Sequence, residues 1–109
     1  MFYLFLAEGF EETEALATLD VMRRARLNVQ TVGVTGVYVT GSHGVTVKPD
    51  VDLSDITFDG LEGVVLPGGM PGTRNLMANA TVCNAAKKRE VSLSQAINVS
   101  SLASRLMRR

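Results

Sequence analysis

Two apolar runs in this chain end in a glycine-bearing turn that leads into a helix start. They are LFLAEGFEETE at residues 4–14 and VVLPGGMPG at residues 64–72. In a parallel α/β sheet such turns lie at the carboxyl ends of the strands, where ligands bind. A reactive nucleophile would stand on a neighbouring turn of the same edge. The stretch after Glu90 does not supply a turn of this kind, so we expect an α/β site that lacks one of its parts.

The remaining pattern predicts a βαβ unit, a hairpin and a second strand-to-helix unit. Continuous apolar runs indicate buried parallel strands, and the three-to-four-residue spacing of Leu16, Leu19 and Met22 indicates a helix. The expected elements are strands over 2–7, 28–34 and 63–66, helices over 13–27, 75–77 and 81–89, a helical turn over 53–56, and a hairpin with arms 37–40 and 45–47. In the tail, apolar residues alternate with polar ones over 91–99, which indicates a half-buried strand, and one or two helical turns are expected over 102–107. Asn79 is the expected N-cap of the last helix.

Length and charge limit the classes of function. A chain of 109 residues forms one domain, here 1–109, and its formal net charge of zero gives no basic field for nucleic acid. No run reaches the ~20 apolar residues that a membrane span needs. One cysteine, Cys83, excludes an internal disulfide, and one histidine, His43, argues against zinc. We expect a cytoplasmic protein without metal or cofactor.

Three motifs in order carry a resemblance to a known family. They are LAEGFEETEA at 6–15 followed by DVMRRA at 20–25, VTGSHGVTV at 39–47, and VLPGGMPGTRNL at 65–76. Together they resemble the ThiJ/PfpI family, in the branch of the Parkinson-associated protein deglycase and its bacterial relatives. The resemblance covers roughly residues 2–89, and the C-terminal half of the family domain is absent from it.

The resemblance implies a fold and a chemistry. The fold is a flavodoxin-like, class I glutamine amidotransferase-like, three-layer α/β sandwich with a mostly parallel sheet, here truncated, and usually a homodimer. The activity is that of a deglycase or glyoxalase-like cysteine enzyme, acting in stress defence on methylglyoxal, a small aldehyde, or on its glycated adducts. Carried over by motif, Glu14 is the acid beside the cysteine sulfur, and Gly68 and Gly69 supply backbone amides to an oxyanion. Without the resemblance, Glu14 is a first-turn carboxylate favoured by the helix dipole by roughly 0.3–1 kcal/mol.

The departure from the family concerns the nucleophile. A segment like Ala-Ile-Cys-Ala-Ala-Pro is expected near Ser100, where the chain reads Ala-Ile-Asn-Val-Ser-Ser over 96–101. Cys83 falls inside a predicted helix, and Ser100 or Ser101 lacks a glycine-flanked elbow and a base. We read 90–109 as a divergent tail, from a frameshift, an alternative splice or a mispredicted gene, and we expect the chain to be inactive.

Two further hypotheses do not involve catalysis. In the first, the chain is a chaperone-like interaction module that associates with related subunits through the first helix. Ala17 and Val21 lie off that helix's main apolar stripe, and Arg23 and Arg24 either join such a contact or are solvated helix-end charges. His43 either lines an interface or is an exposed turn residue. In the second, the chain is an unstable product whose unfinished sheet buries too little apolar surface.

Overall fold

The computed structural model describes residues 1–88 and 97–98, and its centre is a parallel sheet. Its five strands stand in the order β5-β2-β1-β6-β7, and every neighbouring pair is parallel. The strands are β1 Phe2–Leu6, β2 Val29–Gly33, β5 Val51–Asp52, β6 Gly63–Leu66 and β7 Ile97–Asn98. The predicted strands over 2–7, 28–34 and 63–66 are confirmed within one residue at each end.

The strand β1 occupies the middle of the sheet because its side chains are apolar on both faces. Residues 3–6 are fully buried, and Leu4 stands opposite Thr31 of β2 and Val65 of β6. From β1 the chain moves first to one side, to β2, and later to the other side, to β6. The winding direction therefore reverses at the carboxyl ends of β1 and β6, which is where α/β sheets bind ligands.

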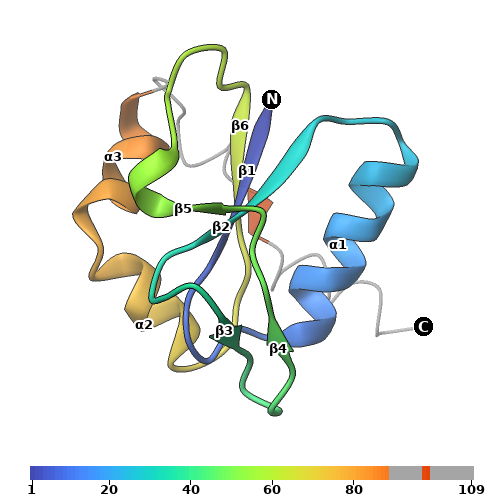
Figure 1. Cartoon of the computed structure of the whole chain (residues 1–109), viewed down its shortest axis with the longest axis vertical. Coiled ribbons are helices and arrows are strands. Elements are labelled where there is room, and N and C mark those ends of the chain that lie inside the picture. Colours follow the sequence, from blue (N-terminus) through green and yellow to red (C-terminus); the bar gives the residue numbers. More distant parts are fainter. Residues whose placement is uncertain (89–96, 99–109) are drawn as a thin grey trace.

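Helices cover both faces of the sheet (Figure 1). The helix α1 Glu12–Arg24 lies on one face, while α2 Gly72–Met77 and α3 Ala80–Lys88 lie on the other. Because side chains alternate along β1, Leu4 and Leu6 pack with Ala15 and Met22 of α1, and Tyr3, Phe5 and Ala7 pack in the second core, beneath α2 and α3. Three layers around a mostly parallel sheet make the flavodoxin-like α/β fold that the resemblance implies.

The bounds of α1 follow from its termini. The Glu11 carboxylate accepts the Thr13 backbone N–H at 3.0 Å and caps the start. Arg26 has a left-handed φ of 63°, so the helix ends at Arg24 and not at the predicted Leu27. Ala17 and Val21 are exposed, as their position off the apolar stripe indicated, and Val21 is 64% exposed.

The hairpin and the second helical unit are present, but α2 begins at Gly72 and not at the predicted residue 75, and the hairpin strands are shorter than the predicted arms. β3 Val39–Thr40 and β4 Thr46–Val47 pair antiparallel around the turn at 41–45, and a 3-10 turn spans Leu53–Asp55. The Asn79 side chain accepts the Val82 N–H at 3.1 Å, which confirms the predicted cap of α3. No helix among residues 1–88 and 97–98 is long and apolar enough to cross a membrane.

The described part of the tail adds a strand to the sheet. β7 pairs with β6, with Ile97 opposite Val65 and Asn98 opposite Leu66. These positions of β6 are therefore covered by β7, and they do not form an open edge of the sheet. The rest of the tail, including Ser100, Ser101 and the helical turn expected over 102–107, lies outside the described residues.

Candidate functional site

The loops that follow β1, β2 and β6 meet at the carboxyl edge of the sheet. The Gly9 N–H donates to Thr40 O at 2.8 Å, which ties the turn after β1 to the hairpin. The Glu11 N–H donates to Gly68 O at 3.0 Å, and the Gly72 N–H donates to Gly9 O at 3.2 Å. The first turn of α1 is thus clamped between the hairpin on one side and the β6–α2 loop on the other.

Glycine is required where these loops touch. Gly69 has a φ of +100°, and a Cβ built there would stand 2.6 Å from the Glu11 N atom. Gly9 has a φ of +87°, and its Cβ would stand 2.3 Å from Pro71 Cδ. Of the Gly68-Gly69 pair, only Gly69 adopts the left-handed conformation.

Glu14 faces the β6–α2 loop from the first turn of α1. Its Oε1 is fully buried and has no hydrogen-bond partner among the described residues. Burial raises the pKa of this carboxyl, the negative charge of Glu11 raises it further, and the Gly68 backbone N–H partly offsets both by hydrogen bonding to the carboxylate. Glu14 and Gly68, both predicted as site residues, are in contact, and Gly69 lies next along the same loop.

Glu12 faces the hairpin, and its pKa is lowered where that of Glu14 is raised. Its carboxylate accepts the backbone N–H groups of His43, at 2.8 Å, and Val45, at 3.2 Å. Burial works against its charge, but the Val45 N–H, its own backbone N–H and the His43 ring and N–H outweigh that and lower its pKa from 4.5 to about 2. Glu12 therefore locks the hairpin onto α1 as a carboxylate.

The sequence analysis did not single out Glu12. In the sequence, only Gly41 hints at this contact: a Cβ added at Gly41 would stand 2.4 Å from the Glu12 Cδ atom. A glycine at the start of a turn rich in backbone N–H groups makes room for an approaching side chain. Nothing in the spacing of 41–45, however, identifies which of three neighbouring glutamates approaches.

His43 is exposed in the turn of the hairpin, and its ring lies beside two carboxylates. Its Nδ1 lies 3.1 Å from Glu12 Oε1 and 3.5 Å from Glu11 Oε2. One ligand atom from each of these three residues falls within 4.8 Å of the other two, the spacing of a potential metal group. Both Glu12 oxygens already accept hydrogen bonds from the hairpin, so we interpret this group as a histidine held beside two carboxylates and not as a metal site.

The other residues weighed in the sequence lie away from this junction. Cys83 sits within α3, where its sulfur contacts Met77 O at 3.5 Å, which fits a structural role. Arg23 binds Asp50 at 2.6 Å and Arg24 binds Asp20 at 3.0 Å, so each has a partner within the chain. These pairs favour the interpretation of Arg23 and Arg24 as helix-end charges.

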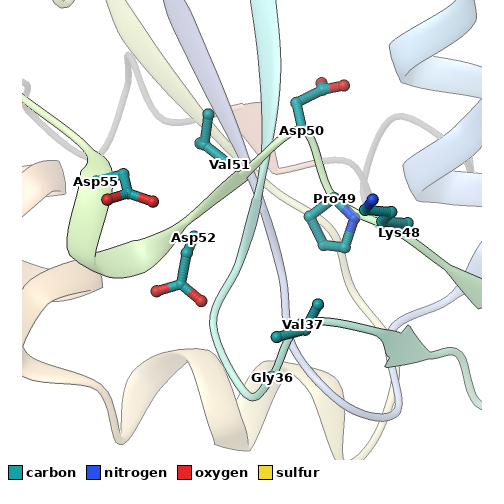
Figure 2. Close-up of a pocket in the computed structure, with 8 residues that line it drawn as sticks. All are labelled: Gly36, Val37, Lys48, Pro49, Asp50, Val51, Asp52 and Asp55. Atoms are coloured by element: carbon teal, nitrogen blue, oxygen red, sulfur yellow. The ribbon is translucent and has the colours of Figure 1, made fainter.

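A separate pocket of about 230 Å³ lies beside β5 (Figure 2), and its lining does not include Glu14 or Gly68. Asp52 and Asp55 stand on one side of it and Lys48 on the other. Burial opposes the charge of Asp50, but the Thr31 N–H and hydroxyl and the Arg23 guanidinium lower its pKa. Two hydrogen bonds from Ser54 lower the pKa of Asp52. Asp50 and Asp52 are held by their own neighbours, so we place the candidate site at the carboxyl ends of β1 and β6.

The comparisons with known proteins identify a family. A family model described as DJ-1/PfpI matches residues 2–98, which continues through β7 beyond the position near 89 where the sequence resemblance was placed. The chain belongs to the DJ-1/PfpI family. It spans about half the length of the relatives that it matches, or less. Two such relatives and one solved structure illustrate this.

The Parkinson disease protein 7 homolog of Danio rerio is 38% identical over 89 residues, which cover 80% of this chain and 47% of that protein. Deglycase TK1284 of Thermococcus kodakarensis is 32% identical over 63 residues, which cover 58% of this chain and 38% of that protein. The structure of oxidized Toxoplasma gondii DJ-1 superposes with a TM-score of 0.79 at 28% identity, covering 89% of this chain and 52% of that one.

Proposed function

We propose that this chain carries the acid and backbone-amide part of a DJ-1-like site for small aldehydes or glycated groups. The observation that carries the proposal is the Glu14 carboxyl, with one oxygen fully buried, set against the Gly68 N–H at the point where the sheet reverses direction. Membership of the family, and a deglycase among the relatives, support it.

The proposed role of Glu14 is to hold a proton. A carboxyl whose pKa is raised by burial keeps its proton closer to neutrality, and as the neutral acid it donates a hydrogen bond to an oxygen or sulfur. A substrate carbonyl oxygen would accept that bond. A backbone N–H of the Gly68-Gly69 turn would bind the negative charge that forms on the carbonyl oxygen when a nucleophile attacks.

The nucleophile is the part that this chain does not bring to the site. Its single cysteine is in α3, and the residues at 96–101 include no thiol. An acid without a nucleophile activates nothing. We therefore propose binding without turnover, with no metal or cofactor involved, in a cytoplasmic protein that does not act on nucleic acid or membranes.

The test is methylglyoxal consumption by the purified chain, beside Glu14→Gln, a thiol-blocked sample and the control Asp20→Asn. Asp20 is an exposed carboxylate on the same helix, paired with Arg24. We expect no consumption above the protein-free blank in any sample. Consumption that Glu14→Gln abolishes and Asp20→Asn retains would contradict the proposed inactivity.

Binding is tested separately by recording backbone amide NMR spectra during addition of methylglyoxal. We expect the Gly68 and Gly69 amide signals to move in the unaltered chain and in Asp20→Asn, and to stay in place in Glu14→Gln. Signals that do not move in the unaltered chain would contradict the proposed binding site, whatever the consumption assay shows.

A second candidate function is association with a related subunit through α1. The exposed Ala17 and the 64% exposed Val21 give this helix an apolar outer side. We expect a dimer in sedimentation, which Val21→Asp disrupts and which the exposed-loop substitution Val37→Asp leaves intact. A strictly monomeric chain at high concentration would contradict this second proposal.

A further inference from the structure

Glu11 lies between two ionisable groups, His43 of the hairpin and Glu14 of α1. Its Oε1 accepts the Thr13 N–H at 3.0 Å and so fixes the carboxylate at the start of α1. Its Oε2 faces His43 Nδ1 at 3.5 Å. On the inner side, Glu11 is the like charge that acts on Glu14. One carboxylate is therefore shared between the exposed hairpin and the buried acid.

A backbone hydrogen bond and close packing hold the segment that carries Glu11 against the β6–α2 loop. The Glu11 N–H binds Gly68 O, while the Gly68 N–H binds the Glu14 carboxylate. Gly69 packs against the same backbone, because a Cβ there would come within 2.6 Å of the Glu11 N atom. The Glu11 and Glu14 carboxyls are three residues apart on the first helical turn, which places them on neighbouring positions of one helix surface.

The charged groups around His43 come from α1 alone among the described contacts. Glu12 approaches at 3.1 Å and Glu11 at 3.5 Å, and the neutral Ser42 hydroxyl contacts Nδ1 at 3.1 Å from the hairpin itself. Glu12 is committed to the hairpin N–H groups. Of these two carboxylates, Glu11 is the one whose charge also acts on Glu14, so Glu11 is the group that the ring and the buried acid share.

We propose that His43 and Glu11 are positioning residues for Glu14, through which the charge on the exposed hairpin decides how readily the buried acid takes up a proton. A neutral ring leaves the Glu11 charge to act fully on Glu14, so Glu14 holds its proton more tightly. A positive ring offsets the Glu11 charge, so Glu14 releases its proton more easily. A cationic or anionic partner at the hairpin would act by the same route. The inference rests on the proposed function of Glu14 as the proton-holding group.

The test follows the Glu14 carboxyl carbon by NMR during a pH titration of the full chain. Glu11→Asn and Glu11→Asp form a matched pair, because both residues cap helices well and only Asp keeps the charge. We expect Glu11→Asn to lower the pH midpoint of the Glu14 titration, because it removes the like charge. Glu11→Asp keeps that charge and should lower the midpoint less. For His43, we expect the permanent cation of His43→Arg to lower the midpoint relative to the neutral His43→Gln.

The decisive comparison places the His43 variants in the Glu11→Asn background. If the hairpin charge acts through Glu11, the His43→Arg and His43→Gln variants differ less in their Glu14 titration midpoints in the Glu11→Asn background than in the parent chain. Added salt should also reduce this difference in the parent chain. Asp20→Asn serves as the distant control and should leave Glu14 unchanged.

The inference would be overturned if Glu11→Asn left the Glu14 titration midpoint unchanged in a folded protein. It would also be overturned if His43→Arg and His43→Gln differed in that midpoint by the same amount with and without Glu11. Because the readout is a titration in the absence of aldehyde, failure here is distinct from failure of the proposed binding.

Discussion

Glu12 and Glu14 are two glutamates on one helical turn that the fold treats in opposite ways. Glu12 faces the hairpin, where two backbone N–H groups and the His43 ring lower its pKa to about 2. Glu14 faces the β6–α2 loop, where burial and the charge of Glu11 raise its pKa and one of its oxygens is fully enclosed. Carboxyls whose environments separate their pKa values in this way have different roles. Here one holds the structure as an anion and the other is set up to keep a proton.

The largest expected effect tests the side of the junction that encloses Glu14. Gly69→Ala forces a Cβ onto a residue with a φ of +100° and into the Glu11 backbone at 2.6 Å. We expect a loss of roughly 2–4 kcal/mol in the free energy of unfolding. Urea denaturation measures it.

Gly44→Ala is the matched control in the hairpin. Its φ is +86°, but no described atom lies within 4 Å of the added Cβ. We expect only the backbone cost, about 1–2 kcal/mol. Equal losses for the two variants would show that the close contact with Glu11 does not hold the loop.

The pH dependence of stability separates the two carboxyls by sign. Glu12 has a folded pKa below its unfolded value, so its stabilisation is present above about pH 4.5 and is lost as pH falls toward 2. Glu14 has a folded pKa above its unfolded value, so it favours the folded state at low pH and this contribution is lost as pH rises through the folded pKa.

Glu12→Gln and Glu14→Gln should therefore give opposite slopes when their unfolding free energies are compared with the parent chain across pH. The disadvantage of Glu12→Gln should shrink toward pH 2, and Glu14→Gln should gain on the parent as pH rises toward neutrality. Denaturant titrations at a series of pH values provide the comparison. Two slopes of the same sign would mean that the fold does not distinguish the carboxyls.

Much of this arrangement follows from local sequence, but the division of roles does not. Continuous apolar runs predict β1 and β6, and Asn79 predicts the start of α3, because those signals act within a few residues. The Glu11-Glu12-Thr13-Glu14 run predicts a helix start for the same reason. Which glutamate meets the hairpin depends on Gly41, about thirty residues away, and on how β1 and β2 set that loop beside α1.

In the tail, too, the local pattern predicts the element but not its partner. Alternation over 91–99 predicted a strand, and its described part, Ile97–Asn98, pairs with β6. Pairing with the central strand is a long-range outcome that alternation alone cannot specify. The catalytic roles of Glu14, Gly68 and Gly69 came from the family resemblance and remain predictions.

A smaller effect is expected from the bond that ties α2 to the turn after β1. The Asn75 side-chain amide donates to Glu8 O at 2.8 Å. Asn75→Ala should cost about 0.5–1.5 kcal/mol in the free energy of unfolding. Thermal melts would detect it, and a cost near zero would mean that solvent replaces the bond.

The smallest effect belongs to the outer hairpin. The Thr46 hydroxyl contacts the Thr40 hydroxyl at 2.8 Å on an exposed surface. Thr46→Val should change the free energy of unfolding by no more than about 0.5 kcal/mol. A larger loss in the same melts would show that the hairpin depends on its own strand pair as well as on Glu12.

The most direct measurement is a site-resolved carboxyl-carbon NMR titration of the unaltered chain. The account predicts that Glu12 titrates near pH 2, while Glu14 titrates above the usual value for a glutamate. Two glutamates that titrate together, or a Glu14 midpoint below that of Glu12, would contradict the claim that this helix turn holds one structural anion and one proton-holding acid.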